Sequence, residues 1–288
     1  MQCFMNKAKT LLFVGAHPDD ETFAIGGTLA HYAAAGVKVY YACATRGEVG
    51  TADEASMRGF ASVGDMRWAE LECAARALGL AGVVYLGYRD SGMAGWPDNK
   101  HPGALAMAPL EQVAGRVVKV IRELKPEVVI THDAMGGYRH PDHVAVHKAA
   151  AAAFNASGDP ALYPEAGPAF QPQKLYFSVF RRGLLRLAVR LMPLFGMDPH
   201  RFGRNKDIDL AGLVAEKFPV HASIRLDKKT VAVRDRATAC YRSQTSGSTM
   251  SRLFGFVSRL SVQRDSYMRA YPPITGKQRE KDLFEGIT

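Results

Sequence analysis

Long apolar runs are missing from this sequence of 288 residues. Its longest apolar stretches, such as Leu11–Ala16, cover only a few residues, whereas a membrane-spanning helix needs about 20. The N-terminal apolar run has no small-residue cleavage site before charged residues begin, so it predicts a buried first strand rather than a signal peptide. We therefore expect a cytoplasmic protein, and membrane contact is not the favoured interpretation.

Cysteine is also scarce. The four cysteines are widely separated and form no Cys-x-x-Cys pair: Cys3, Cys43, Cys73 and Cys240. This spacing argues against a disulfide framework and against a cysteine-based zinc site, and it fits a reducing compartment. We expect all four to behave as buried small hydrophobic side chains.

The first predicted strand lacks the Gly-x-Gly-x-x-Gly loop that binds dinucleotides. The segment His17–Glu21 (HPDDE) follows it instead. Gly26 and Gly27 come too late for phosphate binding, and we expect them to ease helix packing. A non-catalytic Rossmann-like nucleotide-binding module is kept only as an alternative interpretation.

Charge is unevenly distributed along the chain. The formal net charge is +9, and residues 174–206 contain eight Lys or Arg against a single Asp. Such a segment attracts anionic ligands, but it has no interleaved aromatic residues and no nucleic-acid motif, so we expect no nucleic-acid partner. Within it, Gly183–Phe195 has the spacing of an amphipathic helix. This helix could pack on the core, on a second subunit of a homo-oligomer, or on a membrane surface.

Short apolar segments alternate with helical patterns over the first 155 residues. The predicted strands are 10–16, 37–44, 83–86 and 127–131, and the predicted helices are 22–35, 57–78, 110–124 and 141–154. This alternation predicts an α/β fold, a Rossmann-like three-layer arrangement with a mainly parallel sheet. We divide the chain into a catalytic core, residues 1–155, and a smaller C-terminal α+β portion, residues 156–288, that packs on the core and completes the substrate pocket.

Polar clusters follow all four predicted strands. They are HPDDE (17–21), TRGE (45–48), YRDSGM (88–93) and, after a glycine-rich loop, HPDH (140–143). Ligands of open α/β sheets bind outside the carboxyl ends of the strands. These loops are therefore where we expect the functional site.

The histidines and aspartates of two of these clusters have metal-ligand chemistry. A catalytic zinc takes three protein ligands from imidazole nitrogens and carboxylate oxygens. His17 and Asp20 can meet on a tight turn, and His140 or His143 can complete the set at the start of a helix with Pro141 in its first position. The structural alternative is that the aspartates only cap helices, but capping does not require three histidines.

Ala16–Glu21 (AHPDDE) and His140–His143 (HPDH) resemble the two signature motifs of the PIG-L/LmbE-type zinc-dependent deacetylases, which remove an acetyl group from N-acetylglucosamine-type substrates. TRGE, the stretch Arg67–Gly79 and the segment Arg89–Met93 resemble further landmarks of the family, in the expected order. The resemblance covers residues from about Thr10 to Phe154 and is less diagnostic beyond them.

The resemblance implies a role for each matching residue. His17, Asp20 and His143 would bind the metal, zinc by default, although ferrous iron or another divalent ion suits the same ligands. A metal-bound water would attack the amide, with Asp19 as general base. His140 would stabilise the oxyanion and protonate the amine, with its pKa raised by Asp142. The resemblance assigns substrate binding to three further residues: Arg67, Asp90 and Tyr138.

Two positions depart from the family pattern. Arg139 stands where relatives often have Gly, and Tyr241 stands where many have His. We expect a small amino-sugar or glycoconjugate substrate, but the sequence does not fix the acyl group or the amine. An amidase for a larger amide, such as a thiol–sugar conjugate, fits the same site. A metal-dependent phosphoesterase fits less well, because such sites more often use two metals.

Overall fold

The computed structural model describes residues 8–179, 183–201, 209–216, 218–245, 263–274, 276 and 279–287. Its centre is a seven-stranded sheet with the strand order β3-β2-β1-β4-β5-β7-β6. The strands are β1 (Thr10–Gly15), β2 (Lys38–Cys43), β3 (Gly82–Tyr85), β4 (Val128–His132), β5 (Lys174–Ser178), β6 (Ala222–Arg225) and β7 (Arg264–Tyr271). The first five are parallel, and β7 runs antiparallel to both β5 and β6.

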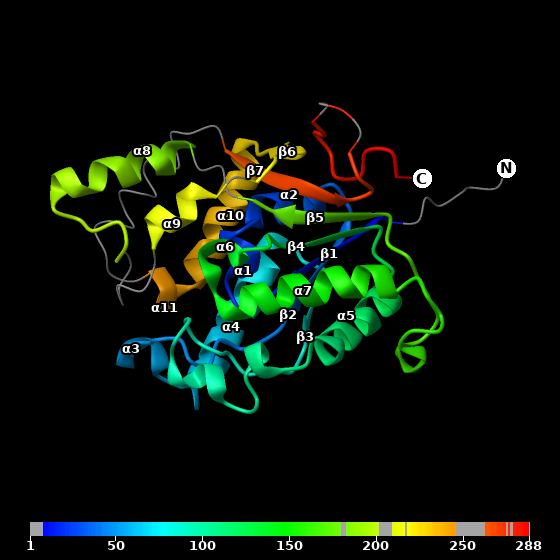
Figure 1. The fold of residues 1–288 in the computed structure, drawn as a ribbon, viewed down its shortest axis with the longest axis horizontal. Helices are drawn as coiled ribbons and strands as arrows, with labels where there is room; N and C mark the ends of the chain where they lie inside the picture. The colour runs from blue at the N-terminus through cyan, green and yellow to red at the C-terminus, as the bar shows by residue number, and fades with distance from the viewer. Residues whose placement is uncertain are drawn as a thin grey trace.

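Helices cover both faces of this sheet (Figure 1). On one face, α5 (Leu110–Leu124) and α7 (Pro141–Ala156) pack against alternate residues of β1, including Leu12 and Val14. On the other face, α2 (Gly26–Ala34), α4 (Val63–Leu78) and α10 (Lys228–Cys240) cover Leu11 and Phe13. Both sides of β1 are buried, which explains its uninterrupted apolar sequence. The predicted α/β fold with a mainly parallel sheet is confirmed.

Shorter helices line the loops between these elements. They are α1 (Asp20–Phe23), α3 (Glu54–Met57), α6 (Gly136–Arg139), α8 (Gly183–Leu191), α9 (Leu210–Ala215) and α11 (Arg242–Thr245), with 3₁₀ turns η1 (Pro97–Lys100), η2 (Leu105–Met107), η3 (Pro164–Ala166) and η4 (Met192–Phe195). No helix within the described ranges is long and apolar enough to cross a membrane.

Two predicted helices are interrupted. The helix expected over 22–35 is divided into α1 and α2, and the one expected over 57–78 is divided into α3 and α4. In the second case Gly59 adopts φ 87° and Ser62 caps α4, its hydroxyl accepting a hydrogen bond from the backbone of Asp65. Gly27 does ease packing as predicted, because a Cβ there would lie 2.1 Å from Leu226.

The predicted state of the cysteines is wrong for one pair. Cys73 on α4 and Cys240 at the end of α10 form a disulfide across 167 residues of sequence. Their wide separation concealed this pairing, because only the folded chain places α10 against α4. Cys43 is free and buried as expected, and Cys3 lies outside the described residues.

The basic segment is not a single exposed patch. Lys174 lies buried in β5, where its ammonium is 2.7 Å from the Glu280 carboxylate. Other members lie outside the part of the chain that the structure describes: Arg181, Arg182, Arg204 and Lys206. The predicted helix over 183–195 is α8 followed by η4, with Pro193 in the 3₁₀ turn.

The strand order determines where the site lies. From β1 the chain moves outward through β2 to β3, and then crosses back to β4 on the other side of β1. The connections leaving β1 and β4 therefore diverge from neighbouring strand ends. Such a switch point is where open α/β sheets bind their ligands.

Candidate metal and catalytic site

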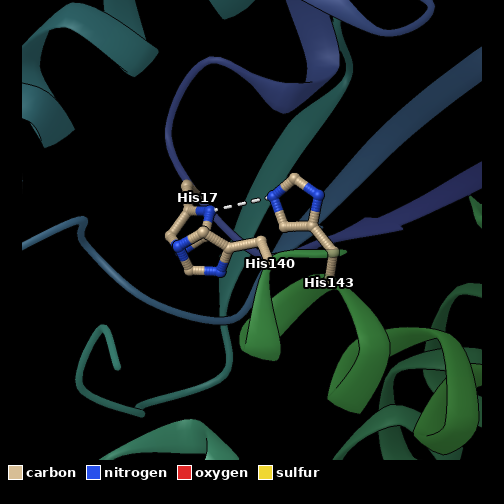
Figure 2. A group of neighbouring side chains, drawn as sticks. All are labelled: His17, His140 and His143. Atoms are coloured by element: carbon tan, nitrogen blue, oxygen red, sulfur yellow. Dashed lines mark hydrogen bonds between the residues drawn. The ribbon is translucent and has the colours of Figure 1, made fainter. Parts of the chain in front are cut away.

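Three histidines from the two motifs converge at this switch point (Figure 2). His17 lies in the loop after β1, His140 directly precedes α7, and His143 lies in its first turn. Nδ1 of His17 is 3.1 Å from Nε2 of His143, and the His17 and His140 rings lie 4.5 Å apart, centre to centre. All three side chains are buried. Two segments more than 100 residues apart thus form one cluster.

Asp20 lies beside these histidines with its two oxygens in different environments. Its Oδ2 accepts hydrogen bonds of 2.9 Å from the backbone N–H groups of Ala16 and His17. Its Oδ1 lies 3.3 Å from Nε2 of His143. The backbone bonds fix the carboxylate, while the second oxygen faces the imidazole cluster.

His132 is part of the site, although the sequence interpretation did not include it. It is the last residue of β4, and its Nε2 lies 3.2 Å from Oδ2 of Asp20. Its ring stacks on that of His143 with centres 4.1 Å apart. The predicted strand ended one residue earlier, at Thr131, and His132 belongs to neither sequence motif, so nothing in the sequence signalled its role.

The carboxylate of Asp142 contacts a different histidine from the one expected. Its Oδ2 lies 3.0 Å from Nε2 of His17 and also accepts a hydrogen bond from the backbone of Ser91. His140 itself caps α7, its Nδ1 accepting from the backbone N–H of Asp142. The capping alternative for Asp142 is therefore wrong, because the histidine takes that position. Asp90 adds a second carboxylate near His17 Nε2, at 3.4 Å.

Buried carboxylates determine the charge preferences of this cluster. Burial alone would lower the pKa of His17, but Asp90 and Asp142 raise it well above its usual value. Burial would likewise raise the pKa of Asp20, but His143 and His132 hold it well below its usual value. The surroundings of His17 thus favour positive charge, and Asp20 is an anion.

His140 is a neutral imidazole here. Burial, aided by the nearby His17, lowers its pKa to about 3. The expectation that Asp142 raises this pKa is therefore wrong, because the Asp142 carboxylate lies against His17 instead. A neutral imidazole is still a hydrogen-bond donor through one of its nitrogens.

Asp19 lies next to the cluster and pairs with Arg67. The Arg67 guanidinium, carried by α4, donates a hydrogen bond of 3.0 Å to Oδ2 of Asp19 and one of 2.7 Å to the carbonyl of Pro18. Burial raises the pKa of Asp19 to about 6, although the charge of Arg67 opposes this shift. A carboxylate with a pKa near neutrality is suited to accepting a proton.

The structure also brings the other predicted site residues here. Arg67 and Asp90 are buried beside Asp19 and His17 respectively, and the ring of Tyr138 lies 5.1 Å from that of His143. Tyr138 is partly exposed, in line with a position at the mouth of the site. Arg139 is exposed and adopts φ 67°, a conformation that favours glycine.

Overlapping groups of these side chains have ligand atoms close enough together to hold a metal ion, among them His17, His140 and His143, and Asp20, His132 and His143. Ligand atoms of a tetrahedral zinc, each about 2.0–2.1 Å from the metal, lie about 3.3 Å apart. Nδ1 of His17 is 3.1 Å from Nε2 of His143, which in turn is 3.3 Å from Oδ1 of Asp20. The other Asp20 oxygen, Oδ2, lies 4.0 Å from Nδ1 of His17. A metal-ligating histidine usually presents its other nitrogen to a carboxylate, as His17 does to Asp142.

Fold and site together define an α/β protein with a buried His/Asp cluster, able to hold a metal ion, at its switch point. The chain belongs to the PIG-L family. Residues 12–154 match the family model described as GlcNAc-PI de-N-acetylase. This match covers the resemblance noted in the sequence and includes both motifs.

Two relatives cover most of the chain. A protein of Rhodococcus erythropolis named 1D-myo-inositol 2-acetamido-2-deoxy-alpha-D-glucopyranoside deacetylase is 42% identical over 295 residues, which covers 97% of this chain and 98% of the relative. A protein of the same name from Geodermatophilus obscurus is 38% identical over 247 residues, 81% of this chain and 84% of the relative. The similarity therefore extends through the C-terminal portion.

Solved structures share the fold at low sequence identity. A conserved protein of Thermus thermophilus aligns with a TM-score of 0.58 and 22% identity, covering 92% of this chain and 96% of that one. The N,N'-diacetylchitobiose deacetylase of Pyrococcus horikoshii aligns with a TM-score of 0.52 and 20% identity, covering 91% and 84%.

Proposed function

We propose that this protein is a metal-dependent deacetylase that hydrolyses the acetamide of an N-acetylglucosamine-type substrate. The observation that carries the proposal is the convergence of His17, Asp20 and His143, with the carboxylate of Asp19 beside them. Amide hydrolysis needs an activated water and a stabilised oxyanion. The cluster has groups suited to both tasks.

The relatives supply the substrate class. At 42% identity over nearly both full lengths, the Rhodococcus erythropolis deacetylase supports 1D-myo-inositol 2-acetamido-2-deoxy-alpha-D-glucopyranoside as the first substrate to test. Partly exposed Tyr138, together with Arg67 and Asp90, would line the sugar-binding pocket, which residues of the C-terminal portion would complete.

His17, Asp20 and His143 would hold the metal. A divalent ion bound there would polarise the amide carbonyl and lower the pKa of water from about 15.7 to about 7. Two imidazoles and one carboxylate accept zinc, and they also accept ferrous iron. Asp142 and His132 would orient the ligands His17 and Asp20 through the contacts described above.

Asp19 would accept the proton of the attacking water. Its ion pair with Arg67 orients the carboxylate, and burial keeps its pKa close to neutrality. His140, neutral at physiological pH, would donate a hydrogen bond to the developing oxyanion. The proton that Asp19 takes from the water would then pass to the departing amine, so His140 would act as general acid only by handing on that proton and would end as it began, a neutral imidazole. Its position in the N-cap of α7 fixes the ring for this role.

The test is release of primary amine from this inositol glycoside and from simpler N-acetylglucosaminides, measured with the zinc-loaded and the iron-loaded protein. Asp19→Asn should keep about one equivalent of metal while losing at least a hundredfold in kcat, because its side chain no longer accepts a proton. Asp20→Ala should lose the metal itself, as measured by elemental analysis after dialysis.

The other outcomes are equally informative. Metal binding at one equivalent without deacetylation would redirect the search to larger amides such as thiol–sugar conjugates. A fully metallated Asp20→Ala variant would refute the ligand assignment, and normal turnover by Asp19→Asn would remove Asp19 from the mechanism.

A further inference from the structure

Tyr241, in the C-terminal portion, contacts Glu21 of the HPDDE motif, which lies 220 residues earlier in the sequence. It follows directly after α10, and its hydroxyl donates a hydrogen bond of 2.7 Å to Oε1 of Glu21. Tyr241 and Glu21 are both 0% exposed. Because a buried carboxylate is stable only when it is hydrogen-bonded, this contact ties the end of α10 to the loop after β1.

The second oxygen of Glu21 holds the backbone of Asp19. Oε2 accepts a hydrogen bond of 3.1 Å from the Asp19 N–H. Asp19 adopts φ 112°, a conformation that residues other than glycine rarely adopt. Backbone strain of this kind persists only where the surroundings fix it. The bond to Glu21 is one such restraint, and it acts on the backbone rather than on the carboxylate.

One face of α4 holds all these parts together. Three of its side chains, spaced three residues apart, make contacts beyond the helix: Arg67 with Asp19, Glu70 with Ser243, and Cys73 with Cys240. Residues at this spacing share a helix face. The same stripe therefore orients the carboxylate of Asp19 and fixes segment 240–243, which carries Tyr241.

We propose that Tyr241 is a positioning residue for Asp19 and acts through Glu21; this inference rests on the proposed role of Asp19 as general base. In this scheme, which we call the relay, the Tyr241 hydroxyl holds the Glu21 carboxylate in place, and Glu21 in turn holds the strained backbone of Asp19. Helix α4 fixes both ends of this relay, through Arg67 at Asp19 and through Glu70 at Ser243. Tyr241 does not touch the substrate in this scheme. Its removal should therefore change turnover rather than substrate or metal binding.

The experiment compares Tyr241→Phe with Tyr32→Phe. Tyr32 is a matched control, because its buried hydroxyl also donates a 2.7 Å hydrogen bond to a carboxylate, that of Asp282, and lies outside the site. Loss of a buried hydrogen bond corresponds to about a tenfold effect. We expect Tyr241→Phe to lower kcat about tenfold at unchanged KM and metal content, and Tyr32→Phe to lower only the melting temperature.

A double-mutant cycle tests whether the effect passes through Glu21. If it does, Glu21→Gln and Tyr241→Phe should be non-additive, with the double variant no slower than Glu21→Gln alone. Additive losses would overturn the relay. If Tyr241→Phe does not fold, Ser243→Ala loosens the same segment at Glu70 while leaving the Tyr241 ring in place, and it should also lower kcat at constant KM.

A structural measurement separates this inference from the proposed function. A crystal structure of Tyr241→Phe should show Asp19 leaving its positive φ, whether or not the wild type deacetylates any tested substrate. An unchanged Asp19 backbone would overturn the inference, as would a wild-type kcat in a folded Tyr241→Phe enzyme. An inactive wild type with the shifted Asp19 backbone in the variant would instead count against the proposed reaction alone.

Discussion

Gly136, the first residue of α6, shows how closely the backbone approaches His143, one of the proposed metal ligands. It adopts φ 63°, and a Cβ built there would lie 2.7 Å from Cβ of His143 and 2.8 Å from the backbone nitrogen of Val144. Both distances are shorter than normal van der Waals contact. The first turn of α7, with its histidine, can sit where it does only because this residue has no side chain.

Gly136→Ala should therefore move His143. We expect at least a tenfold loss of metal affinity, together with about 1–3 kcal/mol of destabilisation from the strained backbone. Gly36→Ala is the matched control, because Gly36 also has a positive φ, 84°, but meets nothing within 4 Å. It should lose stability through its backbone alone. If chelator competition gave the same metal affinity for Gly136→Ala and Gly36→Ala, the close approach of Gly136 to His143 would not matter for metal binding.

Single residues also show how far the sequence could be read at the site. Both motifs and their convergence were predictable, because the carboxyl ends of parallel strands meet at one edge. The contact between the Asp142 carboxylate and His17 was not predictable. Asp142 lies two residues after His140 in the sequence, and this proximity does not determine which histidine its side chain faces. The low pKa of His140 follows from burial among other imidazoles, which is a property of the assembled cluster.

Among the elements, α5 organises a long connection through one side chain. Arg122, near its end, is buried and donates hydrogen bonds to backbone carbonyls of the segment that follows α7: Ala156, Ser157, Asp159, Leu162, Tyr163 and Gly167. Carbonyls at the end of a helix lack partners within that helix. The Arg122 guanidinium supplies hydrogen-bond donors for these carbonyls and so orders the connection to β5.

Arg122→Met should be strongly destabilising. It leaves several carbonyls without their donor, and we expect a loss of about 3 kcal/mol or more in the free energy of unfolding. Arg76→Met on the exposed face of α4 should change it by less than about 0.5 kcal/mol. Guanidinium chloride denaturation measures both values, and a loss below about 1 kcal/mol for Arg122→Met would show that water replaces the guanidinium.

The disulfide between α4 and α10 makes a second prediction at this scale. A cross-link closing a loop of 167 residues stabilises by up to about 5 kcal/mol in the chain-entropy view. Reductant should therefore lower the melting temperature of the wild type and leave that of Cys73→Ser unchanged. A wild type indifferent to reductant would mean that the bond contributes little.

The elements themselves were predicted unevenly. The four N-terminal strands and α5 are where the apolar pattern placed them, because burial on both faces leaves a clear signal in sequence. Helix interruptions were missed where local contacts outweigh periodicity, as at Gly59 and Ser62. The disulfide was missed because the packing of α4 against α10 cannot be inferred from the sequence spacing of Cys73 and Cys240.

The whole molecule is united by a sheet that crosses both portions of the chain. β5, β7 and β6 extend the parallel core on the side of β4, so the portion after residue 155 contributes strands to the same layer. Near the C-terminus, the Glu280 carboxylate contacts three groups of that layer: the buried Lys174 and Tyr176 on β5 and the half-buried Arg269 on β7.

Glu280→Ala should weaken the entire fold rather than one edge. It leaves the buried Lys174 ammonium and the half-buried Arg269 guanidinium without their anion, and removing one partner of a buried pair typically costs about 3–5 kcal/mol. The half-exposed pair Arg89–Asp98 provides a comparison, and Asp98→Ala should cost less than about 1 kcal/mol. We expect a single unfolding transition shifted to lower denaturant. A separate early transition would instead indicate that the C-terminal strands unfold independently.

The position of β4 beside β5 has a consequence for synthesis of the chain. All proposed metal ligands precede residue 144, so a growing chain contains the complete ligand set before β5 has been made. Until then one edge of β4 has no strand beside it, and an unpaired apolar edge can pair with another chain. During synthesis, the proposed metal ligands are therefore present well before β5, the strand that covers the edge of β4 and keeps it from pairing with another chain.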